Sequence, residues 1–187
     1  MKQHIIIING LPRSGKDTFV ELCTQTGLCP VGNFSTVDFV KDIAGECGWA
    51  GTKRPEDRRF LSELKRILNE WDDVANRKTA EAIQGWLDEQ YNYQSWLGDS
   101  KSDDVVVFVH IREPLEIEHF KKVYFPDART LCVCRPGLTA YDQSNDSDKN
   151  VADYRYDDYI DNDSDLTKLA YAARLFMQII TMEDEDA

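Results

Sequence analysis

The sequence predicts an α/β fold organised around a mainly parallel β-sheet. Continuous apolar runs alternate along the chain with segments whose apolar residues recur at helical spacing. The runs are rich in β-branched residues, as is typical of strands that are buried on both faces. A length of 187 residues with 42% hydrophobic side chains suffices for one domain whose core needs no disulfide or structural metal.

The first strand and the first helix follow from the opening of the chain. The run His4-Ile5-Ile6-Ile7-Ile8-Asn9 is bounded by Gly10 and Pro12, which favour a turn. A helix is expected from about Gly15 to a stop at Gly27. A buried strand, a glycine-containing loop and a helix are therefore expected in direct succession.

The remaining elements are assigned by the same criteria. The clearest amphipathic helix starts near Pro55, and we expect Trp71 and Trp86 to pack in the core. The segment 136–165 is polar and rich in aspartate, so we expect a mobile excursion, within which a short strand around 158–161 is possible. The other expected strands cover 34–37, 105–111 and 130–134, and the other expected helices cover 38–47, 79–93, 114–123 and 166–180.

The charge balance and the cysteines restrict partners and compartment. Acidic residues outnumber basic ones by 34 to 22, for a net charge of −12. Binding to nucleic-acid polymers or anionic membranes relies on a broad positive surface, so neither partner is expected. An odd number of cysteines without an N-terminal secretion signal indicates reduced thiols in the cytoplasm. Cys132 and Cys134 share one face of an apolar strand and are expected to be buried structural thiols rather than metal ligands.

The segment Gly10-Leu11-Pro12-Arg13-Ser14-Gly15-Lys16-Asp17-Thr18 carries the main chemical signal. It nearly matches the pattern G-x-x-x-x-G-K-[ST], and it lies between the first strand and the first helix, as a phosphate-binding loop must. Its glycines permit a backbone that turns successive N–H groups toward one phosphate. The helix N-terminus adds a partial positive charge, and Lys16 adds a full charge at the outer phosphates. The whole segment is therefore predicted to bind nucleotide.

Asp17 stands where a Ser or Thr hydroxyl usually binds Mg²⁺. A carboxylate can also ligate or water-bridge Mg²⁺, which prefers hard oxygen ligands. Thr18 is adjacent, but its side chain points about 100° further round the helix. Because a carboxylate beside the phosphates is tolerable only with the metal present, we expect ATP and Mg²⁺ as cofactors and Asp17 as a metal ligand.

The loop also indicates a family. The run from Arg13 to Thr18 resembles the R-S-G-K-D-T loop of bacteriophage-type deoxynucleoside monophosphate kinases and is similar to the K-S-G-K-D loop of animal-type phosphomevalonate kinases. Both belong to the nucleoside monophosphate kinase branch of P-loop folds, and both carry Asp at this position. The resemblance implies a three-layer fold of the P-loop NTP hydrolase type in one domain over 1–182, with a helical acceptor region at about 38–97, a lid at about 136–156 and an acidic tail at 183–187.

Two weaker matches concern the acceptor side. The segment Val37-Asp38-Phe39-Val40-Lys41 resembles the x-x-P-[LI]-K segment of the family, with Phe39 in place of proline, which puts Lys41 forward as a contact to the acceptor phosphate. Arg58 and Arg59 open a long helix and resemble the arginine region of the acceptor-binding helices.

Two further matches lie later in the chain. Val109-His110-Ile111-Arg112 is similar to the strand-end motif V-x-D-x-R, so that Arg112 carries over as an acceptor contact while His110 replaces the aspartate. The stretch 157–163 resembles the F-D-x-x-I-x-N-D-G segment that precedes the last helix of the family.

Phosphoryl transfer requires two anions to be brought in line and their charge neutralised. Lys16 and Arg13 would serve the donor, and Arg112 would serve the acceptor. Arg135 follows a buried strand and opens the polar segment, so it could close over the nucleotide. We therefore assign catalytic roles to these four cations.

These residues favour an ATP-dependent kinase whose small phosphorylated acceptor is a nucleoside or deoxynucleoside monophosphate. Two alternatives remain open. A sulfotransferase is one, because the segment 12–15 resembles the phosphosulfate loop of that class. A noncatalytic ATP-binding protein is the other.

Overall fold

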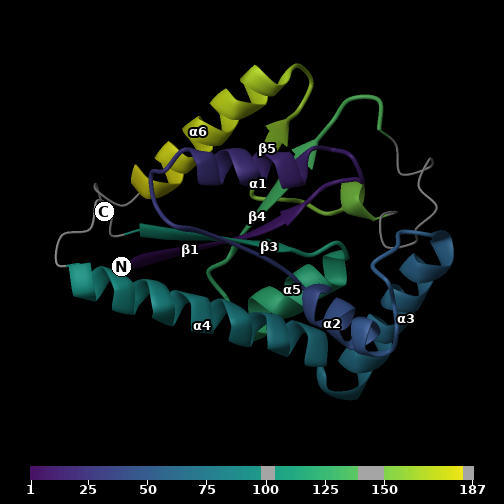
Figure 1. Ribbon diagram of the computed structural model, residues 1–187. Helices are drawn as coiled ribbons and strands as arrows, with labels where there is room; N and C mark the ends of the chain where they lie inside the picture. The colour runs from purple at the N-terminus through teal and green to yellow at the C-terminus, as the bar shows by residue number, and fades with distance from the viewer. Residues whose placement is uncertain (98–103, 139–149, 183–187) are drawn as a thin grey trace.

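A five-stranded sheet forms the centre of the molecule (Figure 1), and the computed structural model describes residues 1–97, 104–138 and 150–182. All pairings between neighbouring strands are parallel, which confirms the predicted class. In spatial order, the strands are β2 (Val31–Ser35), β3 (Asp104–His110), β1 (Lys2–Asn9), β4 (Arg129–Cys134) and β5 (Asp158–Asp161).

The central strand β1 explains why the opening run is apolar throughout. Ile5 and Ile7 belong to the core on one face of the sheet, and Ile6 and Ile8 belong to the core on the other. Successive side chains of a strand point to opposite faces, so a strand covered on both sides needs apolar residues at every position.

Helices cover both faces of the sheet and complete three layers (Figure 1). One face is covered by α1 (Lys16–Gln25) and α6 (Leu166–Met182), and the other by α4 (Val74–Leu97) and α5 (Pro114–Val123). The helices α2 (Asp38–Glu46) and α3 (Pro55–Asp72) pack beside α4, and the 3₁₀ turn η3 (Val151–Asp153) precedes β5. The helical core residues include Phe19, Val20, Leu169, Phe176 and Met177 on the first face and Ile83, Leu87, Ile117 and Phe120 on the second.

The strand order creates a crevice at one edge of the sheet. The neighbouring strands β1 and β3 lead into α1 and α5, which lie on opposite faces (Figure 1). Chains that leave adjacent parallel strands in opposite directions open a crevice outside the carboxyl ends of those strands, where α/β proteins bind ligands. The glycine-containing loop lies at this edge because it follows β1.

The edge strand β2 differs from its prediction. It was expected at 34–37, and it runs over Val31–Ser35 in register with Val106–His110 of β3. A Cβ at Gly32 would stand 3.2 Å from the ring of Trp86 on α4, so a glycine allows this helix to pack closely on the strand. The place of β2 is therefore determined by its packing on α4 and its pairing with β3. These contacts outweigh the low β-propensity of Gly32.

The burial predicted for α3 is wrong, although the helix itself is confirmed. Trp71 is 78% exposed, and Phe60 and Ile67 are also exposed. Most contacts of α3 are to α4 and α2 rather than to the sheet, so part of its apolar stripe stays exposed. Trp86 is half-buried and packs edge-to-face on Phe34, with ring centroids 6.3 Å apart.

Parts of the predicted lid and tail lie outside the described residues, namely 139–149 and 183–187. Among the helices that the structure describes, none combines the length and the apolar composition that a membrane crossing requires.

Candidate functional site

The loop between β1 and α1 has the backbone of a phosphate-binding loop. Gly10, Arg13 and Gly15 have φ values of +149°, +67° and +98°. A Cβ at Gly10 would meet the carbonyl oxygen of Val133 at 2.5 Å, so this position accepts glycine alone without a shift of β4. Arg13 adopts a left-handed conformation despite its side chain, a strain that proteins concentrate at ligand-binding sites.

Two asparagines hold this loop in place. Asn9 accepts a 2.8 Å hydrogen bond from the N–H of Gly10 and donates from Nδ2 to Arg112 O at 2.9 Å. Asn162, between β5 and α6, donates from Nδ2 to Ser14 O at 2.8 Å. Its own N–H binds the carbonyl oxygen of Cys134 at the end of β4. The loop is thus tied to three neighbouring strand ends.

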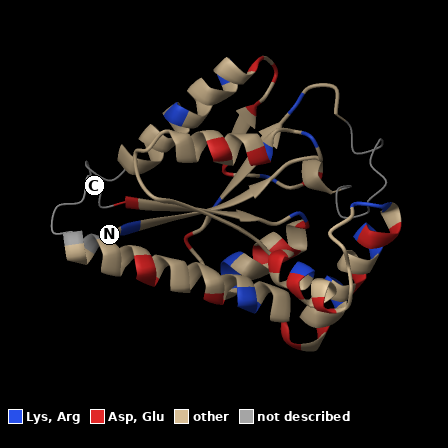
Figure 2. Cartoon of the chain, in the orientation of Figure 1, with Lys and Arg blue, Asp and Glu red and all other residues tan. Residues whose placement is uncertain are grey.

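Three cations meet at a cleft of about 300 Å³ beside the loop. Arg13, Lys16 and Arg135 line it together with Gly15, Asp17 and Thr18. Lys16 Nζ donates to Gly10 O at 3.3 Å, so its ammonium group lies against the loop. Figure 2 shows acidic residues spread over the helices of both outer layers, so this group of cations is a local exception to the net charge of −12.

Ser14 brings an unsatisfied donor into the loop. Its Oγ is buried and has no hydrogen-bond partner among the described residues. A buried hydroxyl without a partner costs about 1–3 kcal/mol, and such groups in native proteins commonly indicate a missing ligand or water. The loop is therefore suited to an acceptor such as a phosphate oxygen.

The carboxylate of Asp17 is 86% exposed at the start of α1, and its Oδ1 lies 3.7 Å from Nδ1 of His110. The other ring nitrogen of His110, Nε2, is hydrogen-bonded to Asn33 Oδ1 at 2.9 Å. Burial lowers the pKa of His110 to about 4, and Lys16 lowers it further while Asp17 opposes the shift. The imidazole is therefore neutral at physiological pH.

The residues predicted for the acceptor do not line the cleft. Arg112 follows β3 and is exposed, and its carbonyl oxygen supports Asn9. Lys41 on α2 pairs with Asp38 Oδ1 at 2.8 Å. Arg58 and Arg59 are exposed in the first turns of α3.

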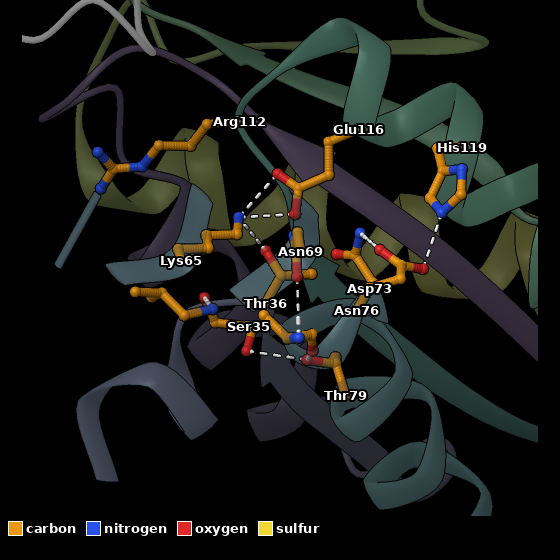
Figure 3. A network of polar contacts seen from close by, with 12 residues as sticks. Ser35, Thr36, Lys65, Asn69, Asp73, Asn76, Thr79, Arg112, Glu116 and His119 are labelled. Carbon is orange, nitrogen blue, oxygen red and sulfur yellow. Dashed lines mark hydrogen bonds and ion pairs between the residues drawn. The ribbon is translucent and has the colours of Figure 1, made fainter. Parts of the chain in front are cut away.

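A polar network between α3, the residue after β2 and α5 is not predicted by the sequence (Figure 3). Lys65 of α3 donates to Thr36 Oγ1 and to Glu116 Oε2, both at 2.7 Å. Its side chain is 20% exposed and that of Glu116 is 10% exposed. The ion pair joins α3 to the first turn of α5, and the hydrogen bond to Thr36 joins α3 to the residue that follows β2. A lysine at one position of a charged helix gives no sequence signal for such a role.

The Cys132 and Cys134 side chains lie on one face of β4 as predicted, with their Sγ atoms 3.6 Å apart. Cys132 is buried and Cys134 is half-buried. Burial and the neighbouring Cys134 raise the pKa of Cys132 to about 12, so the thiol stays protonated. Within the described ranges, no group of three or more His, Cys, Asp or Glu side chains is arranged to hold a metal ion by itself.

Solved structures with a related fold exist, whereas no protein-family model and no curated protein matches the sequence. The chain is similar to TT1252 from Thermus thermophilus, with 20% identity over 97% of this chain and 100% of that one and a TM-score of 0.54. It is also similar to dephospho-CoA kinase from Campylobacter jejuni, with 16% identity over 97% and 99% and a TM-score of 0.49. A third similar structure is shikimate kinase from Aquifex aeolicus, with 14% identity over 95% of this chain and 98% of that one and a TM-score of 0.47.

The likeness to the Thermus protein shows a shared fold along nearly the whole chain. Together with the strand order and the loop at the end of β1, it confirms the predicted three-layer α/β fold of the P-loop NTP hydrolase type.

Proposed function

We propose that this protein is an ATP- and Mg²⁺-dependent phosphotransferase whose acceptor is a small phosphorylated molecule, first of all a nucleoside or deoxynucleoside monophosphate. The observation that carries the proposal is the cleft in which Arg13 and Lys16 of the loop meet Arg135 from the end of β4. The acceptor class comes from the resemblance of the loop to deoxynucleoside monophosphate kinases.

The donor side requires charge neutralisation at the transferred phosphoryl group. Lys16 would contact the outer phosphates from within the loop, and Arg13 and Arg135 would approach them from two different elements. Cations that line a binding cleft stabilise the negative charge that develops on a phosphoryl group bound there. The N–H groups of Gly15 and Lys16 at the start of α1 add the partial charge of the helix terminus.

The residues of the loop fit a divalent cation next to the phosphates. Asp17 offers a carboxylate at the rim of the cleft, which is the kind of oxygen ligand that Mg²⁺ prefers. Bound Mg²⁺ supplies charge compensation between the outer phosphates of the donor. Without it, the carboxylate of Asp17 would repel them.

The acceptor would bind on the side of α2, α3 and the end of β3. Arg112, Lys41, Arg58 and Arg59 are the proposed contacts to its phosphate. The ion pair of Lys41 with Asp38 is exposed, and such pairs contribute only about 0–1 kcal/mol, so an incoming phosphate could displace Asp38 at little cost.

The experiment that tests the function measures binding and turnover separately. Binding is followed as the rise in melting temperature with MgATP and with adenosine 3′-phosphate 5′-phosphosulfate. Turnover is followed as ADP release with a panel of acceptors that holds nucleoside monophosphates, their deoxy forms and phosphomevalonate. We expect stabilisation by MgATP and ADP release with a deoxynucleoside or nucleoside monophosphate.

Each other outcome identifies an alternative. Stabilisation by MgATP without ADP release for any acceptor indicates a noncatalytic ATP-binding protein. Stabilisation by the phosphosulfate nucleotide alone indicates a sulfotransferase. Release of ADP with phosphomevalonate alone retains the reaction class and overturns the acceptor.

A further inference from the structure

The side chains of Asp17 and His110 face each other at the edge of the nucleotide cleft without a donor between them. In the tautomer in which Nε2 of His110 carries the ring proton, this nitrogen donates to Asn33 Oδ1 across 2.9 Å. Nδ1 then keeps its lone pair, and this atom lies 3.7 Å from Oδ1 of Asp17. Two electron-rich atoms that face each other in this way are stabilised by a cation between them.

The spacing of the two atoms suits a single metal ion. Donors at about 2.1 Å from an octahedral ion are about 3 Å apart in adjacent positions and about 4.2 Å apart in opposite ones. The observed 3.7 Å is about 0.7 Å longer than the adjacent spacing, a gap that rotation of the 86% exposed Asp17 side chain can close. The bond from Nε2 to Asn33 also has the form of the outer contact that orients metal-binding histidines, whose second N–H usually donates to an oxygen acceptor.

The donor set favours a transition metal over Mg²⁺. Mg²⁺ is bound through carboxylates, phosphates and water, whereas imidazole nitrogen suits first-row transition metals. We propose that Asp17 and His110 together bind a divalent first-row transition-metal ion beside the nucleotide phosphates, so that Mn²⁺ binds with the nucleotide more tightly than Mg²⁺, which also supports phosphoryl transfer. The proposal rests on the proposed nucleotide binding, because two protein ligands need the phosphate oxygens to complete the coordination.

The direct test detects a histidine nitrogen on the metal. Protein labelled with [¹⁵N]histidine is mixed with Mn²⁺ and the non-hydrolysable ATP analogue AMP-PNP, and electron spin echo envelope modulation is recorded. We expect modulation from a directly bound ¹⁵N nucleus in the wild-type protein and in the control variant His119→Gln, whose histidine pairs with Asp73 on another part of the surface. We expect its loss in His110→Asp.

The second test measures metal preference by calorimetric titration with AMP-PNP in Mn²⁺ and in Mg²⁺. Loss of a metal-binding side chain or of its support commonly costs about 10- to 100-fold in metal affinity. We divide the dissociation constant of AMP-PNP in Mg²⁺ by that in Mn²⁺. This ratio should be about tenfold or more lower in His110→Asp than in the wild type, and it should not change in His119→Gln.

The outcomes separate the two proposals. A nucleotide complex with Mn²⁺ that shows no histidine modulation overturns the transition-metal site and leaves the proposed function in place. Failure of AMP-PNP to bind with either metal overturns both. Because the spectroscopic test needs only the wild-type protein, a variant that fails to fold does not affect the decision.

Discussion

The side-chain amide of Asn162 donates a 2.8 Å hydrogen bond to the backbone oxygen of Ser14, across 148 positions of the chain. The same amide group is the first atom that a Cβ at Gly15 would meet, at 2.4 Å. The segment before α6 therefore packs against the phosphate-binding loop and holds it. Asn162 belongs to the stretch 157–163, which resembles a family motif and to which the sequence alone assigns no role.

This contact predicts that Asn162→Ala binds ATP more weakly than the wild type. A lost hydrogen bond of this kind is worth about 1 kcal/mol, which corresponds to about a fivefold weaker affinity for ATP. Isothermal titration with MgATP measures it, with Asn92→Ala on the exposed face of α4 as the control. Equal affinities in both variants would show that the loop holds its shape without Asn162.

Lys16→Ala is expected to abolish phosphoryl transfer while the fold persists. Lys16 lies in the loop region with its ammonium group 3.3 Å from Gly10 O, so the variant removes a full positive charge from the proposed phosphate site. ADP release measures the loss, circular dichroism and the melting temperature check the fold, and Lys122→Ala on the exposed side of α5 is the control. Turnover that survives in Lys16→Ala would reject the assignment of the site.

Gly10→Ala is expected to destabilise the protein more than Gly27→Ala. Both glycines have a positive φ, so both variants carry a backbone strain of about 1–2 kcal/mol. At Gly27 an added Cβ meets nothing within 4 Å, whereas at Gly10 it meets the carbonyl oxygen of Val133. Thermal melting compares the two variants, and equal losses would mean that β4 yields to the new methyl group.

Glu116→Ala is expected to lower the free energy of unfolding by about 2–3 kcal/mol, because it leaves the partly buried ammonium group of Lys65 without its anion. The double variant Lys65→Met, Glu116→Leu should lose less than the sum of the single variants. Denaturant unfolding measures each loss. Arg66→Ala on the same helix, whose pairs with Glu63 and Glu70 are exposed, is the control and should cost about 0–1 kcal/mol.

The start of α3 predicts a contribution to stability that disappears in acid. The side chain of Arg54 and the hydroxyl of Thr52 hold the pKa of Asp57 at about 2, below its ordinary value of 3.8. A carboxyl group whose pKa is lower in the folded state stabilises the protein above pH 3.8, and this contribution is lost as the pH falls toward 2. Between pH 6 and pH 2.5, the melting temperature should therefore fall less steeply for Asp57→Asn than for the wild type.

The control for this acid dependence is Asp42→Asn, an exposed carboxyl group on α2, which should follow the wild-type curve. Parallel curves for the wild type and Asp57→Asn would show that the contact to Arg54 does not alter stability.

Local patterns predicted the approximate place of two elements well. The helix α5 was expected around 114–123 and the strand β5 around 158–161, and both lie there. The loop lies where its motif requires, between β1 and α1. The pattern of α3 predicted a helix correctly but its burial wrongly, because periodicity shows that a face is apolar and does not show what lies against it. Trp71 is the clearest example, since it belongs to the apolar stripe and is exposed.

By itself, the sequence determined the class of the fold and the place of its phosphate-binding loop, since both depend on the order of residues over short stretches. Only the tertiary structure decided that Asn162 contacts Ser14 and that His110 lies opposite Asp17. The physical reason is the strand order, which places the ends of β3, β4 and β5 around β1 through pairings that no local pattern encodes.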